Sequence, residues 1–220
     1  MPRDSTVTRE KLIRAAEYLF ARHGFDVPIR DIQDRAGQRN ATALQYHFGG
    51  KRELVWAIIE RHTPPPGELQ AVRDDLASKQ DDPRALVEAI VRRLASSLAT
   101  EEGRDYNRMM FQLVTQAPVR QSMVEGVEAP QIISVPYESA LIRARVPGLP
   151  ERFVQERAVA GLAFILLQIA DRARDIDDNE GKGLIDEDDF ITNLVDMTTA
   201  MLTAPTSVGA DAVAAKQVRV

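Results

Sequence analysis

The chain has 220 residues, and its composition is 44% hydrophobic and 28% charged. This apolar fraction can fill a core, which excludes a chain that is disordered throughout, and the length allows one large or two modest domains. The absence of cysteine excludes disulfides, thiolate catalysis and zinc sites that depend on sulfur. The longest strongly apolar stretch, residues 159–170, is shorter than the roughly 20 residues of a membrane span, and no signal peptide opens the chain, so we expect a cytoplasmic protein outside the membrane.

The net charge of −5 is unevenly distributed along the chain. Residues 1–62 contain 11 Lys and Arg against 8 Asp and Glu, whereas residues 63–220 contain 17 against 25. The asymmetry predicts a basic N-terminal module attached to an acidic body.

Helical periodicity, interrupted by glycine and proline, divides the N-terminal module into four predicted helices. Gly24 and Gly37 end the first two, Gly49 ends the third, and a run of three prolines at 64–66 stops the fourth. Asn40 is the expected N-cap of the third helix. The four predicted segments are 8–23, 28–36, 40–48 and 51–63.

The rest of the chain is predicted to be helical, with no strand signal. The acidic run 175–186 matches only the first half of a calcium-binding loop and is interpreted as a solvated linker. We therefore predict an all-α protein with a helix-turn-helix domain over 1–62, a larger helical ligand-binding and dimerisation domain over 63–203, and a flexible tail over 204–220. The predicted helices of the second domain are 68–79, 83–100, 103–116, 118–126, 135–145, 150–175 and 186–203.

Two short helices joined by a glycine turn form the predicted helix-turn-helix unit. Burial of Leu44 and Phe48 turns Thr42 and Tyr46 toward the opposite side of the third helix. Small side chains on that side would let the helix approach a DNA groove, and glutamine or asparagine can bond a base edge. Such geometry also occurs in folds that do not bind DNA. The candidate DNA contacts are Arg9, Arg30, Arg39, Asn40, Thr42, Ala43, Gln45, Tyr46, His47 and Lys51.

The spacing of these residues resembles the N-terminal domain of TetR-family transcriptional regulators. The resemblance covers residues 6–62 and rests on the segments TREKLIRAAEYLFARHGF (8–25), IRDIQDRAG (29–37) and LQYHFGGKREL (44–54). Residues 37–48 are one residue longer than the commonest family spacing. The resemblance implies that Arg30, Tyr46, His47 and Lys51 contact phosphates or lie beside them. It places Thr42, Ala43 and Gln45 near base edges.

The resemblance also implies a symmetric dimer, most often a repressor, that binds a palindromic DNA operator. The segment 150–175 is apolar around most of its circumference, which independently favours a dimer interface shared with 186–203. The alternative is that 150–175 is the central core helix of a monomer.

A ligand chamber between residues 68 and 145 is a further implication of the resemblance. We expect a small apolar or amphipathic effector, with Arg108, Tyr106 or Arg143 meeting any carboxylate on it. Core packing is the plainer interpretation of each lining residue. The candidate pocket residues are Tyr106, Met109, Met110, Leu113, Met123, Tyr137, Leu141, Phe164 and Gln168.

No nucleophile and base stand at a recognisable spacing, so we predict neither an enzyme nor a bound cofactor or metal. Two alternatives are an all-α enzyme and a helical interaction module whose basic N-terminal part binds an acidic protein. Binding to DNA is distinguished from both by a steep decrease in affinity as salt rises.

Overall fold

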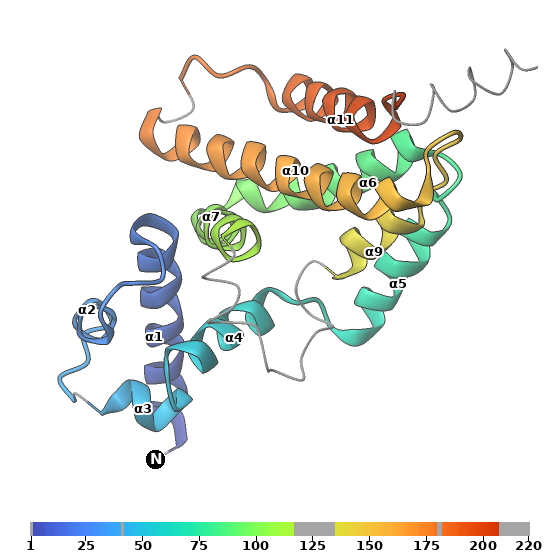
Figure 1. Ribbon diagram of the computed structural model, residues 1–220. Helices are drawn as coiled ribbons and strands as arrows, with labels where there is room; N and C mark the ends of the chain where they lie inside the picture. The colour runs from blue at the N-terminus through green and yellow to red at the C-terminus, as the bar shows by residue number, and fades with distance from the viewer. Residues whose placement is uncertain (1, 41, 117–134, 180–181, 207–220) are drawn as a thin grey trace, which may run out of the picture.

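The computed structural model describes residues 2–40, 42–116, 135–179 and 182–206. Every regular element in these ranges is a helix, which confirms the predicted all-α class. Helices α1 to α4 occupy one end of the molecule, and the long helices α10 and α11 lie side by side at the other (Figure 1). The elements are α1 (Pro2–His23), α2 (Ile29–Arg35), α3 (Ala43–Phe48), α4 (Lys51–His62), α5 (Pro66–Ala77), α6 (Pro83–Ala95), the 3-10 helix η1 (Ser96–Ala99), α7 (Glu101–Thr115), α9 (Val135–Arg143), α10 (Glu151–Asn179) and α11 (Glu187–Thr203).

A first hydrophobic core holds α1 to α4 together. Phe20, Ile32, Leu44 and Ile58, one from each helix, are fully buried in it. Each such side chain stabilises the fold by about 1.5–3 kcal/mol. Because Leu44 anchors α3 from the inside, the opposite side of α3 is left to solvent.

This core also includes residues of α7. Met109, Met110 and Leu113 are buried in the same cluster as the apolar side chains of α1 and α4. The four N-terminal helices, called the head below, therefore pack directly on the remaining helices, called the body. Because α7 and α1 share one closely packed core, a movement of α7 also displaces α1.

A second core holds the body together. Leu86 and Ile90 of α6 pack with Ile165 and Ile169 of α10, and Leu194 of α11 closes the cluster. Helix α10 runs along both α7 and α11, so its apolar circumference is covered on more than one side.

The third helix begins two residues later than predicted. Helix α3 begins at Ala43, because Asn40 forms a separate turn in which its Oδ1 accepts hydrogen bonds from the Thr42 amide at 3.0 Å and the Thr42 hydroxyl at 2.8 Å. This competition of an asparagine side chain with helical hydrogen bonding is common before helix N-termini. Gly49 ends the helix as predicted, with a φ of 83° that glycine adopts without strain.

Three other helices differ from the prediction by more than two residues at one end. Helix α1 begins at Pro2, and the predicted helix 83–100 divides into α6 and the 3-10 helix η1. Helix α10 continues to Asn179, so the first residues of the expected acidic linker are helical. The predicted helix 118–126 lies outside the described residues.

Among the described helices, α10 is long and apolar enough to cross a membrane by length and composition alone. The sequence predicted no such segment, because the uninterrupted apolar run 159–170 within this helix is too short and is flanked by the charged residues Arg157 and Asp171. The buried contacts of Ala158, Ile165 and Ile169 with α6, α7 and α11 account for this composition as that of a core helix.

Candidate nucleic-acid interface and the body behind it

Helix α3 divides its six residues between the core and solvent. Ala43 and Leu44 are buried, whereas Gln45 is exposed and Tyr46 is 81% exposed. The Gln45 amide and the Tyr46 ring are therefore available to a macromolecule that approaches from outside. Ala43 was predicted near base edges, but it is buried with Leu44 in the core of the head, because the first turn of α3 packs against this core.

The turn before α3 is fixed by its own side chains. Gln33 of α2 donates from Nε2 to the Asn40 carbonyl at 3.3 Å, and the Asn40 Oδ1 accepts hydrogen bonds from Thr42. Asn40 and Thr42 remain exposed, so they lie at the surface as predicted. Their hydrogen bonds to each other give them a structural role in holding the turn.

Cationic side chains are exposed on the segments that flank α3 along the chain. The Arg30 side chain of α2 is 88% exposed, and its guanidinium lies 3.7 Å from the Asp34 carboxylate. Arg39 is also exposed, and it borders an open hollow together with Arg30 and Gln38. Arg9 of α1 places its guanidinium 5.3 Å from the centre of the Phe48 ring, which links the two helices by a cation–π contact.

Two other candidate DNA contacts, Lys51 and His47, already interact with neighbouring residues of the chain. The Lys51 ammonium donates to the Phe25 carbonyl at 2.9 Å, so this half-buried lysine ties α4 to the loop after α1. The His47 ring lies between the rings of Tyr46 and Phe48, at 5.1 and 6.3 Å between centroids. The sequence did not single out Arg52, an exposed cation next to Lys51.

A cavity of about 120 Å³ lies in the body, next to the end of α4. Three of the candidate pocket residues, Tyr106, Met110 and Tyr137, line it. The described lining residues come from six segments and are His62, Thr63, Pro64, Leu69, Val72, Arg93, Leu94, Tyr106, Asn107, Met110, Tyr137, Leu162 and Leu166.

The other pocket candidates lie elsewhere. Met109 and Leu113 are buried in the head core and Leu141 in the body core, because each faces a neighbouring helix. Phe164 and Gln168 are half-buried on α10 and are not among the lining residues. Met123 lies outside the described residues.

Two of the expected carboxylate partners are placed differently from the prediction. Arg108 is buried and bonded to Asp105 and Asp177, so it is not available to an effector. Arg143 is exposed and does not line the cavity.

His62 connects the cavity to α1. Its ring stacks on Tyr106 with 4.0 Å between centroids, and its Nε2 lies 2.5 Å from Oε1 of the buried Glu17. Arg61 donates to the other oxygen of Glu17 at 3.0 Å. No local signal in the sequence reveals this partner, because Glu17 lies 45 residues from His62.

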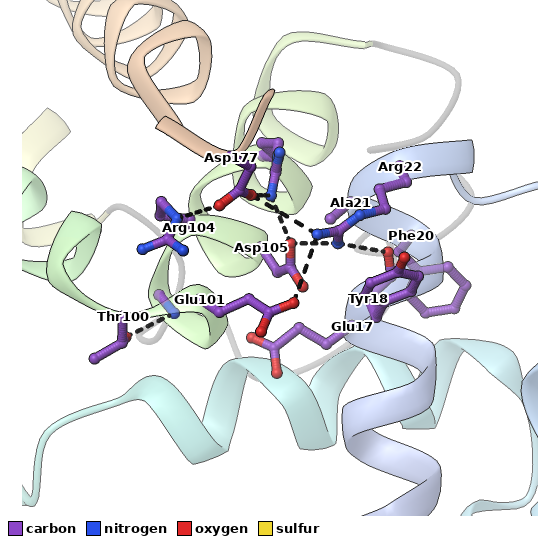
Figure 2. A network of polar contacts seen from close by, with 12 residues as sticks. Glu17, Tyr18, Phe20, Ala21, Arg22, Thr100, Glu101, Arg104, Asp105 and Asp177 are labelled. Carbon is purple, nitrogen blue, oxygen red and sulfur yellow. Dashed lines mark hydrogen bonds and ion pairs between the residues drawn. The ribbon is translucent and has the colours of Figure 1, made fainter. Parts of the chain in front are cut away.

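An ion-pair network also joins the head to the body through α7 (Figure 2). Arg22 of α1 bonds Asp105 at 2.5 Å, and Arg108 bonds the same oxygen at 2.7 Å. Arg108 continues to Asp177 of α10, which also accepts from Arg104 at 2.6 Å. The network therefore links α1, α7 and α10 through alternating charges.

The two carboxylates of this network respond differently to their surroundings. Burial raises the pKa of Asp105, and the charges of Arg22 and Arg108 offset only part of this rise. Burial also acts to raise the pKa of Asp177, but the hydrogen bonds and charges of Arg108 and Arg104 outweigh it and lower the pKa. Asp177 is the carboxylate that the network holds ionised most strongly.

Among the residues that the structure describes, no group of three or more histidines and carboxylates is arranged to hold a metal ion.

Comparison with known proteins agrees with this arrangement. Residues 12–58 match the family model of the bacterial regulatory proteins of the tetR family. No curated protein matches the chain in sequence. The fold is similar to that of NalD, the secondary repressor of the MexAB-OprM multidrug efflux pump in Pseudomonas aeruginosa, with a TM-score of 0.60 and 23% sequence identity over 92% of this chain and 98% of that one. The matched residues contain α2, α3 and the glycine turn between them, so the likeness to the tetR family lies in the helix-turn-helix part of the chain.

Proposed function

We propose that this protein is a ligand-responsive repressor that binds a palindromic DNA operator as a homodimer in the cytoplasm and is released by a small effector. The observation that carries the proposal is the exposed side of α3, where Gln45 and Tyr46 face solvent, together with the exposed arginines on the segments before and after this helix. Residues 1–62 would bind DNA, and 63–203 would bind the effector and the second subunit. The similarity to NalD, a repressor, supports the direction of regulation.

In this proposal Gln45 reads a base edge, while Arg30, Arg39 and Arg9 contact phosphates. The Tyr46 hydroxyl and the His47 ring lie where the backbone of a duplex would pass. Lys51 keeps a phosphate contact through the two N–H groups that Phe25 does not use.

A second copy of the chain would cover the outer side of α10 and α11. Val159, Met197 and Met201 are large apolar side chains that remain exposed there. These two helices lie at the end of the molecule away from α3 (Figure 1), so a symmetric contact leaves both recognition helices free. The two helices must then stand roughly 34–36 Å apart to enter successive major grooves.

Effector binding would act through the wall that the cavity shares with the head. His62 and Tyr106 line the cavity, and the buried Glu17 bonds His62 from α1. A molecule that separates the His62 and Tyr106 rings shifts the end of α4 against α1. A change of this kind in both subunits would alter the separation of the two recognition helices. They could then no longer enter both major grooves at the same time.

Selection of bound duplexes from a random pool tests the proposal directly. We expect a palindromic sequence to emerge and its affinity to fall steeply with salt, with a scrambled duplex of equal length as control. Light scattering should give twice the monomer mass of 24.5 kDa. Equal affinity for the selected and scrambled duplexes would contradict operator recognition, and a monomer on the operator would contradict the dimer.

A further inference from the structure

The cavity in the body has a one-sided distribution of charge. Of its described lining residues Arg93 carries a full positive charge, and none is an aspartate or glutamate. The Arg93 guanidinium makes no hydrogen bond or ion pair with the described part of the chain, whereas the adjacent Arg92 bonds Glu88 at 2.8 Å. Arg93 is therefore a cation at the cavity that has no counter-ion among these residues.

Two tyrosine hydroxyls add hydrogen-bond donors to the lining of the cavity. Burial raises the pKa of both Tyr106 and Tyr137, so both hydroxyls stay protonated at neutral pH. The positive charge of Arg93 offsets part of the rise in the pKa of Tyr137, so the guanidinium interacts electrostatically with this phenol. Neither hydroxyl has a hydrogen-bond partner in the part of the chain that the structure describes, so both can donate to a bound acceptor.

The remaining lining is apolar and small. Leu69, Val72, Leu94, Leu162 and Leu166 form most of the other walls. A volume of about 120 Å³ is slightly less than that of an apolar protein cavity of about 150 Å³ that holds benzene. A single ring, or an alkyl group of similar size, fills such a space.

We propose that the effector of this cavity is an amphipathic carboxylate with one small apolar body, held with its carboxylate at Arg93 and the Tyr137 hydroxyl and its body among the leucines. This inference rests on the proposed effector response and specifies its chemical class. A cationic amphiphile would meet a guanidinium without a compensating carboxylate, which is a repulsive contact.

Three probes of equal size and different charge test the inference: benzoate, benzamide and benzylammonium. Titration calorimetry or ligand-observed NMR on the full chain should show benzoate binding most tightly and benzylammonium least. The Arg93→Gln variant should weaken benzoate about five-fold and leave benzamide unchanged, since a partly exposed ion pair is worth about 1 kcal/mol. The matched control is Arg92→Gln, one position away and outside the cavity lining.

A charge reversal makes the test sharper. In the Arg93→Glu variant the preference should invert, with benzylammonium binding more tightly than benzoate. Tighter benzylammonium binding to the unchanged protein, an unaltered order in Arg93→Glu, or equal benzoate affinity in Arg93→Gln and the unchanged protein would overturn the inference.

Failure of the inference and failure of the proposed function give different results. Binding of the probes with the wrong charge order overturns the effector class alone. Binding of none of the three overturns the inference, while operator selection by the ligand-free protein still tests DNA recognition separately.

Discussion

Arginines serve opposite purposes on the outer side of α3 and at the junction between head and body. Beside α3, Arg30 and Arg39 are exposed, and the nearest carboxylate to Arg30 lies 3.7 Å away. At the junction, Arg22, Arg104 and Arg108 are largely withdrawn from water and each bonds an aspartate (Figure 2). The buried arginines are paired with aspartates inside the fold. The exposed arginines remain available to phosphates. Burial distinguishes the two roles, since the residue type is the same.

The largest effect should come from removing the central arginine of the junction. Arg108→Ala leaves the buried Asp105 and Asp177 short of one partner, so we expect the free energy of unfolding to fall by about 3–5 kcal/mol. Denaturant unfolding measures this change. The control Arg39→Ala, at the exposed surface, should change stability by less than about 0.5 kcal/mol. Equal losses in the two variants would remove the distinction between the regions.

The contribution of Asp177 should depend on pH with a defined sign. Its folded pKa lies below the ordinary value of about 3.9, so its stabilising effect is complete above that value and is lost as the pH falls through the folded pKa. We expect Asp177→Asn to cost about 2–3 kcal/mol at pH 7, less than a fully buried pair, and progressively less as the pH falls below the ordinary value.

Unfolding of both proteins between pH 7 and pH 3 measures this difference. The raised pKa of Asp105 gives that residue the opposite trend, with its contribution most favourable below the ordinary value and lost as the pH rises through the folded pKa. A loss in Asp177→Asn that stays constant with pH would contradict the ionised role of Asp177.

A smaller and purely functional effect is expected on the α3 side. Gln45→Ala should weaken binding to the selected operator by about 1–3 kcal/mol and relax the preference at one base pair, with stability unchanged, because the side chain is exposed. Competition with single-base variants of the operator measures the preference. An unchanged preference at every base pair would mean that α3 enters the groove in another register.

The smallest expected effects distinguish the roles of two cations of the head, Arg30 and Lys51. Arg30→Ala should weaken all duplexes alike and reduce the salt slope by about 1, with no loss of stability. Lys51→Ala should also lower the free energy of unfolding, by about 1.5 kcal/mol, because the ammonium bonds the Phe25 carbonyl. Identical stabilities of the two variants would show that the Lys51 contact does not contribute to folding.

Much of the head could be predicted from sequence because its signals are local. The apolar period of α1 and the glycine that ends α3 lie within a few residues of the structure they specify. The same period indicated that Leu44 is inside and Tyr46 outside. It misplaced Ala43, because the Asn40 turn delays the helix and a competing side-chain hydrogen bond has no periodic signature.

Local patterns in the sequence were enough to predict the all-helical class and the polar, exposed side of α3. The pairing of Asp177, the burial of Arg108 and the contact of His62 with Glu17 depend on packing between distant segments. His62 and Glu17 are 45 residues apart, and Asp177 lies 69 residues from Arg108 and 73 from Arg104. An acidic run or a terminal histidine resembles a solvated segment until folding brings an opposite charge beside it and removes the water that would otherwise satisfy it.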